Sequence, residues 1–293
     1  MSFARAGLLL APFFFGVLAP VRLVAAAPPA LTAKQVIDRI KAKIACERRL
    51  RDSVDTFKGG DPGAKVTGIA TTFAATFEVL GRAAASGKNL VITHEPTFYE
   101  HREDTRPIEG DPVLEAKRAF IRKHGLIVWR FHDQVHCGRP DAIYQGVIKV
   151  MGWQERQRPG TPATFTLPAI TVRALSTDLK ERLKARAVRV VGNLDLPVTK
   201  VGFLAGASDA ADQIRLLARD DVEVLVAGES REWETVEYAR DAVAQGRKKA
   251  LILLGHVPSE EAGMEATASW LRGFVSEVPV EFIPAGDPFS SVQ

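Results

Sequence analysis

The order of apolar runs and amphipathic stretches along the chain constrains its fold most strongly. Short runs rich in β-branched residues alternate with longer segments that place apolar residues at helical spacing. For example, the expected strand at 89–94 precedes an expected helix at 111–125, and the expected strand at 222–228 precedes one at 232–246. This alternation is typical of layered α/β folds. We therefore predict an α/β protein.

The alternation occurs twice, with a less regular stretch between its two occurrences. We expect a first α/β half at 31–153, a connecting region at 154–198 and a second α/β half at 199–293. The connecting region begins with a proline-rich segment that should lead into one or two antiparallel strands. Segments 82–96 and 241–258 share the order helix, glycine, basic residue, apolar strand, histidine and proline. The two segments are too diverged to establish a duplication, but if both halves are built alike, each places a histidine at the carboxyl end of a strand.

The first residues do not fit this pattern. Arg5 precedes an apolar run at 6–19, and a stretch of small residues then leads into two prolines. This order is typical of a secretory signal peptide, which we expect at residues 1–26. An uncleaved membrane anchor is the alternative, although the run is short for a bilayer span and Pro12 interrupts it. The mature protein is expected to be periplasmic or secreted, without membrane attachment.

Charge and cysteine content exclude some classes of protein. The formal net charge is +4, and losing Arg5 and Arg22 with the leader lowers it to +2. Because the basic residues are spread along the chain, we expect no nucleic-acid partner. Cys46 and Cys137 could pair in an oxidising compartment, but two cysteines make no disulfide framework, and we expect free or buried thiols. Cys137 directly follows His136, so it could lie near the site of that residue.

Histidines gather where the expected strands end. Of the six histidines in the chain, four lie at or just after such ends: His94, His132, His136 and His256. Glu95 follows His94 directly, and Glu260 lies four residues after His256. Ligand sites form at the carboxyl ends of parallel strands, and imidazole with carboxylate suits first-row divalent metals. The pattern predicts a site for divalent metal, and a mixed set of histidines and carboxylates can hold two such ions, for example zinc, manganese or iron.

Each member of this set also has a purely structural interpretation. A single histidine at a strand end is more often a structural residue, and the segment that begins at His132 reads as a loop. Glu260 falls in the first turn of a helix expected from residue 258, where a carboxylate also suits the helix dipole. Glu229 could line the same site or serve only at a helix N-terminus. His101 and His124 lack strand-end placement and are left out.

The motifs around these residues resemble those of the Nif-three family, also described as dinuclear-metal-centre hexameric proteins or as type-two GTP cyclohydrolase I. "VITHEP" is similar to the family's Ile-x-His-His-Pro, with Glu95 in place of the second histidine. "LLGHVPSE" matches its late Gly-His-x-x-x-Glu at His256 and Glu260. The resemblance covers nearly the whole chain after the leader, and this last motif is the most specific.

Three weaker elements follow in the same order. "FHDQVH" lies where the family has His-Thr-Asn-Leu-Asp, with His132 on the histidine and His136 on the aspartate. "VAGES" resembles a Thr-Gly-Glu element at Glu229, and "DSVDTFKGGDP" resembles an early Asp-Asn-Val-Gly-Leu segment at Asp55. Asp133 remains an alternative to His136 as a metal ligand.

The resemblance implies a fold and an assembly. It implies two linked, similar α/β halves with a metal pair in the cleft between them, and a toroidal homo-hexamer. It also implies a set of metal ligands: His94, Glu95, His136, His256 and Glu260. Relative to the family, one histidine has become a glutamate and one aspartate a histidine, so the set still holds three histidines and two carboxylates. The leader is a second departure, since the family is mostly intracellular.

These observations predict an exported, metal-dependent hydrolase that acts on a small-molecule substrate. A metal-bridging water would be the nucleophile, and His132 or Glu229 would orient a ligand or transfer a proton. The resemblance suggests a phosphoester or a nucleotide-like ring as substrate. The alternative is a non-catalytic metal-binding or scaffold protein. A GTP cyclohydrolase ranks below both, because free GTP is scarce outside the cytoplasm.

Overall fold

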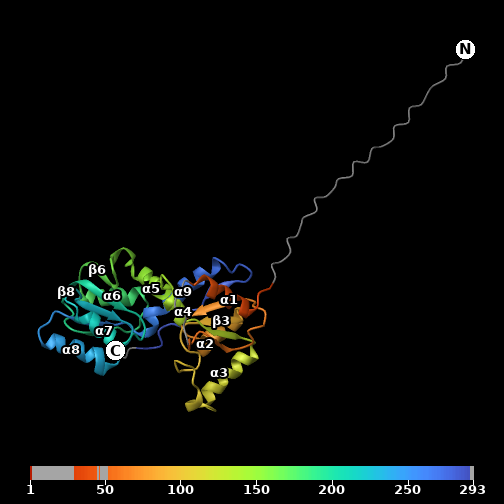
Figure 1. The fold of residues 1–293 in the computed structure, drawn as a ribbon, viewed down its shortest axis with the longest axis horizontal. Coiled ribbons are helices and arrows are strands. Elements are labelled where there is room, and N and C mark those ends of the chain that lie inside the picture. Colours follow the sequence, from red (N-terminus) through yellow and green to blue (C-terminus); the bar gives the residue numbers. More distant parts are fainter. Residues whose placement is uncertain (2–29, 45, 47–51, 291–293) are drawn as a thin grey trace.

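The computed structural model describes Met1, residues 30–44, Cys46 and residues 52–290. Two sheets lie side by side, and the helices α4 (Asp133–Cys137), α5 (Ala142–Met151) and α9 (His256–Arg272) lie between them (Figure 1). The predicted α/β class is confirmed. Apart from Met1, the expected leader falls outside the described residues. Among the helices that are described, none combines the length and apolar character needed to cross a membrane.

The first sheet has the strand order β1-β4-β3-β2-β11. Its strands, in chain order, are β1 (Phe57–Gly59), β2 (Ile69–Thr72), β3 (Leu90–Thr93), β4 (Ile127–Arg130) and β11 (Val280–Phe282). All neighbours pair in parallel except β1, which is antiparallel to β4. Every residue of β2, β3 and β4 is buried, as expected for parallel strands that are covered on both faces.

Helices cover both faces of this sheet. Buried side chains of α1 (Ala33–Lys43) and α9 pack on one face, and those of α2 (Phe77–Ala85) and α3 (Pro112–Lys123) pack on the other. A capping box at Thr32 begins α1, and the Asp111 carboxylate accepts two backbone N–H groups at the start of α3. A 3-10 turn at Arg106–Ile108 precedes α3.

The second sheet has the strand order β5-β6-β8-β9-β10-β7. Its strands are β5 (Gln157–Arg158), β6 (Thr161–Thr171), β7 (Arg189–Val191), β8 (Pro197–Leu204), β9 (Val224–Ala227) and β10 (Ala250–Leu253). The central strands β8, β9 and β10 are parallel, and the outer strands are antiparallel to their neighbours.

Helices also cover both faces of the second sheet. One face packs against α5 and α6 (Val172–Arg182), and the other against α7 (Ala210–Ala218) and α8 (Glu237–Ala244). A 3-10 turn at Gln154–Arg156 precedes β5, and a π-helical turn at Glu232–Val236 leads into α8.

The sheets do not follow the expected boundaries between the halves. Residues 154–198 supply the strands β5, β6 and β7 to the second sheet and the helix α6 to one of its faces, so they are more than a connection. The strands β5 and β6 are antiparallel, as expected. The last strand, β11, pairs with β2 in the first sheet. The reason is α9, which packs against β2 and carries the chain from β10 back to the first sheet. Local patterns reveal a strand but not its partner.

The backbones of α5 and α9 are in close contact. A Cβ atom on Gly263 would lie 2.4 Å from Ile143 Cα, and one on Gly146 would lie 2.6 Å from the Ala262 carbonyl oxygen. Ile143 belongs to the core beside the first sheet, whereas Val147 belongs to the core beside the second. This helix pair therefore joins the two cores, and its glycines allow the close approach.

Replacing Gly263 should separate these helices. We expect Gly263→Ala to lower the free energy of unfolding by about 1–3 kcal/mol, because the added methyl group meets backbone atoms that cannot rotate away. Thermal denaturation measures the loss. Gly81→Ala in α2 is the matched control, since its Cβ would have no atom within 4 Å and alanine favours a helix. Equal melting temperatures for the two variants would contradict the tight contact.

The expectation of free thiols is wrong. Cys46 and Cys137 form a disulfide that joins the segment after α1 to the C-terminal end of α4. The two residues are 91 positions apart, and in the chain-entropy model a crosslink over such a loop stabilises a fold by roughly 4–5 kcal/mol. Cysteine spacing gave no sign of this bond, because only the tertiary fold brings the end of α1 beside α4.

Candidate metal centre

The carboxyl ends of strands from both sheets meet at one place. His94 directly follows β3, and His132 follows β4 after a single residue. From the second sheet, Glu229 lies just past β9, and His256 begins α9 just past β10. Open α/β sheets form their ligand sites at such strand ends. All the predicted site residues lie in this cluster, whereas His124 packs on Phe120.

Two carboxylates lie at the centre of the cluster. Glu95 Oε1 is 3.9 Å from Nε2 of His94, 3.6 Å from Nε2 of His132 and 3.5 Å from Nε2 of His256. Glu260 Oε2 is 3.3 Å from Nε2 of His94 and 3.0 Å from Nε2 of His256. The Nε2 atoms of three histidines thus converge on two carboxylate oxygens.

The other ring nitrogen of each histidine faces an oxygen atom outside this centre. The Nδ1 contacts are His94 to Phe131 O at 3.0 Å, His132 to Asp133 Oδ1 at 2.9 Å, His136 to Asp141 Oδ2 at 2.9 Å and His256 to Glu229 Oε1 at 3.3 Å. A neutral imidazole that donates from Nδ1 has a free lone pair on Nε2, and histidine ligands of metals are usually oriented in this way.

His94 gives the clearest evidence that the residues fit a metal. Its side chain is 0% exposed, and its Nε2 forms no hydrogen bond of good geometry within the described part of the chain, although Glu260 Oε2 lies 3.3 Å away. Burial disfavours the charged form of His94, yet Glu260 and Glu95 raise its pKa. Two groups of possible ligand atoms share this residue: His94 with His132 and His136, and His94 with Glu95 and Glu260. In each group the atoms lie within 4.8 Å of one another. Imidazole and carboxylate donors suit zinc, manganese or iron.

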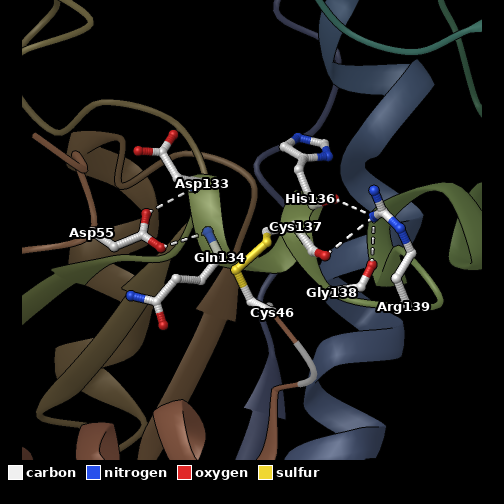
Figure 2. The surroundings of a disulfide bond; sticks show 8 residues. All are labelled: Cys46, Asp55, Asp133, Gln134, His136, Cys137, Gly138 and Arg139. Carbon is white, nitrogen blue, oxygen red and sulfur yellow. Dashed lines mark hydrogen bonds between the residues drawn. A yellow bond between two sulfur atoms is a disulfide. The ribbon is translucent and has the colours of Figure 1, made fainter. Parts of the chain in front are cut away.

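The segment predicted as a loop after His132 is the short helix α4. His132 is its N-cap residue, and His136 lies four residues later, so the two rings approach with centroids 5.1 Å apart. The Asp55 carboxylate accepts the backbone N–H groups of His132, Asp133 and Gln134 at 2.7–2.9 Å. Figure 2 shows this carboxylate against the start of α4. The cap comes from 77 residues away, so local sequence could not reveal it.

The helix expected from residue 258 begins earlier. His256 is the first residue of α9, which places His256 and Glu260 on the same face of one helix. Pro258 lies within the first turn, where a missing N–H group costs no helical hydrogen bond. The site therefore takes two residues from one helix turn, whereas we expected a strand end and a separate helix.

The charges of the cluster favour a cation. Burial opposes ionisation of Glu95, but His256 and His94 outweigh it and lower the pKa of Glu95 to about 2. The pKa of Glu260 is also lowered, because the same two histidines outweigh its burial. Burial disfavours the charged form of His256, yet Glu229, Glu260 and Glu95 raise its pKa to about 12. A divalent ion held by these carboxylates could take the place of the proton on His256.

Sequence reasoning missed several residues that orient the cluster. The buried Arg130 donates to the backbone oxygens of His94 and His101 and to Glu95 Oε2. An arginine inside an otherwise apolar strand was the available signal. Asp141 accepts two N–H groups at the start of α5 through Oδ1 and holds His136 through Oδ2. His101, which we left out, brings its ring centroid to 5.4 Å from that of His132.

Asp133, the alternative ligand, uses both of its oxygens elsewhere. Oδ1 contacts His132 Nδ1 at 2.9 Å, and Oδ2 accepts the Val54 N–H at 3.0 Å. The side chain therefore orients His132 and anchors the chain beside Asp55. Its position favours His136 over Asp133 as the residue that could hold an ion.

Solved structures resemble this fold at low sequence identity. The Bacillus cereus protein related to NIF3 has a TM-score of 0.72 at 14% identity, over 90% of this chain and 100% of its own. The hypothetical protein SA1388 of Staphylococcus aureus has a TM-score of 0.70 at 14% identity, over 90% and 100%. Reduced HcgD from Methanocaldococcus jannaschii has a TM-score of 0.64 at 13% identity, over 87% and 98%. At this identity the similarity supports the fold alone.

Sequence comparisons identify the family. No curated protein matches the chain. The profile of the family described as Duf34/NIF3 (NGG1p interacting factor 3), however, matches residues 31–288, which is most of the chain. The resemblance inferred from the His94, His256 and Glu260 motifs is thereby confirmed. The chain belongs to the Duf34/NIF3 family.

Proposed function

We propose that this protein is a metal-dependent hydrolase that holds two divalent ions in the cluster around Glu95. One observation carries the proposal. The Nε2 atoms of His94, His132 and His256 lie within 3.5–3.9 Å of Glu95 Oε1, while the Nδ1 atom of each ring faces an oxygen outside the centre. This orientation is the one that histidine ligands of metals adopt.

The two groups of ligand atoms suggest how the ions would be shared. The first group, His94, His132 and His136, would hold one ion. Glu260 of the second group, with His256 Nε2 at 3.0 Å, would hold the other. Glu95 Oε1 faces histidines of both sets and could contribute to holding either ion. When bound, two such ions lower the pKa of a shared water and polarise an oxygen of the substrate.

The surrounding residues support this arrangement. Arg130 donates to Glu95 Oε2, which leaves Oε1 facing the histidines. Burial and the neighbouring His94 lower the pKa of His132 to about 4, so its ring is neutral and can donate a lone pair. We therefore propose His132 as a ligand rather than a proton carrier. Glu229 faces His256 Nδ1, and its side chain is 51% exposed, so it can orient that ring and exchange protons with solvent.

A cavity beside Glu229 suits a small-molecule substrate. Its volume is about 490 Å³, and Ser208, Ser230, Arg189 and Arg231 line it together with the carboxylates Asp209, Glu229 and Glu234. Arg189 and Arg231 each pair with a glutamate, at 3.0 and 3.2 Å. Pockets of this size hold small ligands, and hydroxyl and guanidinium donors suit an oxygen-rich group such as a phosphoester. We propose a phosphoester substrate on this basis. We also propose that the mature chain is exported, because the sequence predicts a signal peptide at residues 1–26.

Metal content and turnover, measured on the same samples, test this function. Protein purified without chelator should contain about two transition-metal equivalents per chain by elemental mass spectrometry. Hydrolysis of a chromogenic phosphodiester should rise with occupancy as zinc, manganese or iron is returned to the apo protein. The variant His124→Ala, which removes a histidine outside the cluster, should match the wild type. Bound metal without turnover of any ester would contradict the hydrolase and leave a non-catalytic metal-binding protein.

A further inference from the structure

The helix α4 is too short to be stable by itself. It spans five residues, and isolated helices shorter than about 12 residues are marginal in water. Yet this helix carries His136, and His132 is its N-cap residue. The position of these imidazoles therefore depends on what holds the two ends of α4.

Different groups hold the two ends. At the N-terminal end, the Asp55 carboxylate accepts three backbone N–H groups. At the C-terminal end, the Arg139 guanidinium donates to the carbonyl oxygens of His136, Cys137 and Gly138 at 2.8–3.2 Å. The disulfide from Cys137 to Cys46 joins this same end (Figure 2).

The disulfide connects α4 to a well-anchored part of the fold. The Cys46 N–H donates to the carbonyl oxygen of Ile44, the C-cap residue of α1. That helix buries Val36, Ile37 and Ile40 in the core beside the first sheet. Arg139, by contrast, follows α4 directly in the chain and can move with it. His136 Nδ1 also contacts Asp141 Oδ2 at 2.9 Å, and Val135 of α4 is buried in the core beside the first sheet. The disulfide adds to these contacts the covalent link that holds the end of α4 beside His136.

Four of the other proposed ligands lie outside α4 and do not depend on this link, and His132 lies at the N-terminal end of α4, which Asp55 holds. His94 and Glu95 follow β3, which is buried between two parallel neighbours. His256 and Glu260 lie in the first two turns of α9, a helix of 17 residues that packs on α5 and the first sheet. Loss of the disulfide should therefore leave these four residues in place.

We infer that the Cys46–Cys137 disulfide is a positioning device for one of the two ion positions, the one that takes His136. The inference rests on the proposed function. Reduction of the disulfide releases the C-terminal end of α4, and His136 leaves the cluster. The protein then retains only one ion, the one held by His256 and Glu260. Occupancy by the second ion then reports the thiol oxidation state of the protein.

The redox step needs a two-electron reductant. With a water-soluble trialkylphosphine, the phosphorus attacks one sulfur atom and the S–S bond breaks. Water supplies the oxygen of the phosphine oxide and the two protons of the thiols. A phosphine is preferable to a dithiol here, because a dithiol would itself bind the metal.

Metal content of the full chain in both redox states tests the inference. The oxidised wild type should hold about two zinc equivalents, and the phosphine-reduced wild type about one. A Cys46→Ser, Cys137→Ser variant should also hold about one zinc equivalent. Because this variant has no thiols at these positions, the thiols formed by reduction would be excluded as the cause of the loss. Hydrogen exchange should become faster in a peptide covering α4 and stay unchanged in one covering the start of α9. Reoxidation should restore the second equivalent in the wild type only.

The possible outcomes separate this inference from the proposed function. Two equivalents in the reduced protein and in the serine variant, with unchanged exchange in α4, would overturn the inference and leave the metal centre intact. Loss of both ions, or loss of the circular dichroism signal on reduction, would overturn the selective role of the disulfide. No ion in the oxidised wild type would overturn the proposed function together with this inference.

Discussion

A variant that carries both His94→Ala and His256→Ala is expected to lose both metal equivalents and remain folded. His94 belongs to both groups of ligand atoms, and His256 Nε2 faces both Glu95 and Glu260. Removing a residue that only orients a ligand often weakens metal binding 10- to 100-fold. Removing two ligands should therefore weaken it by more than about 100-fold at each position.

Elemental mass spectrometry beside circular dichroism measures this loss. The fold should persist, because β3 pairs with both of its neighbours and α9 is held by its contacts with α5. The variant His124→Ala is the control, since this residue belongs to neither group of ligand atoms and packs on Phe120 instead. Two equivalents retained in the His94, His256 variant would show that the ions bind elsewhere.

The part of the site that the sequence predicted lies at the ends of apolar strands. An apolar run such as Leu90–Thr93 predicts a buried strand. His94 and Glu95 follow this run directly, so they can be placed at the carboxyl end of the strand. Parallel pairing then brings His94 and His132 to the same edge of the first sheet. These inferences need only local periodicity and a general rule about sheets.

The features that the sequence did not predict depend on contacts between distant segments. The helix α4 forms because Asp55 caps it, and Cys137 pairs because α1 ends beside it. Likewise β11 looks like any short strand, yet it joins the first sheet because α9 returns the chain there. Propensity within a short window carries no information about such partners.

The second prediction with a large effect concerns Asp55, which holds the other end of α4. We expect Asp55→Ala to lower the free energy of unfolding by about 3 kcal/mol, since three backbone N–H groups lose their acceptor. The loss should be smaller than three full hydrogen bonds. Burial raises the pKa of Asp55 despite these bonds, so desolvation already offsets part of their gain in the wild type.

Chemical denaturation and metal content together test the role of Asp55. Asp55→Asn keeps one acceptor oxygen and should lose about half as much stability as Asp55→Ala. Asp220→Ala removes a fully exposed carboxylate and should change little. If Asp55 positions α4, Asp55→Ala should also lose the ion assigned to His132 and His136 and keep the one at His256 and Glu260. Wild-type stability with two ions retained would mean that α4 forms without its cap. The disulfide at the C-terminal end of α4 would then have to hold the helix in place.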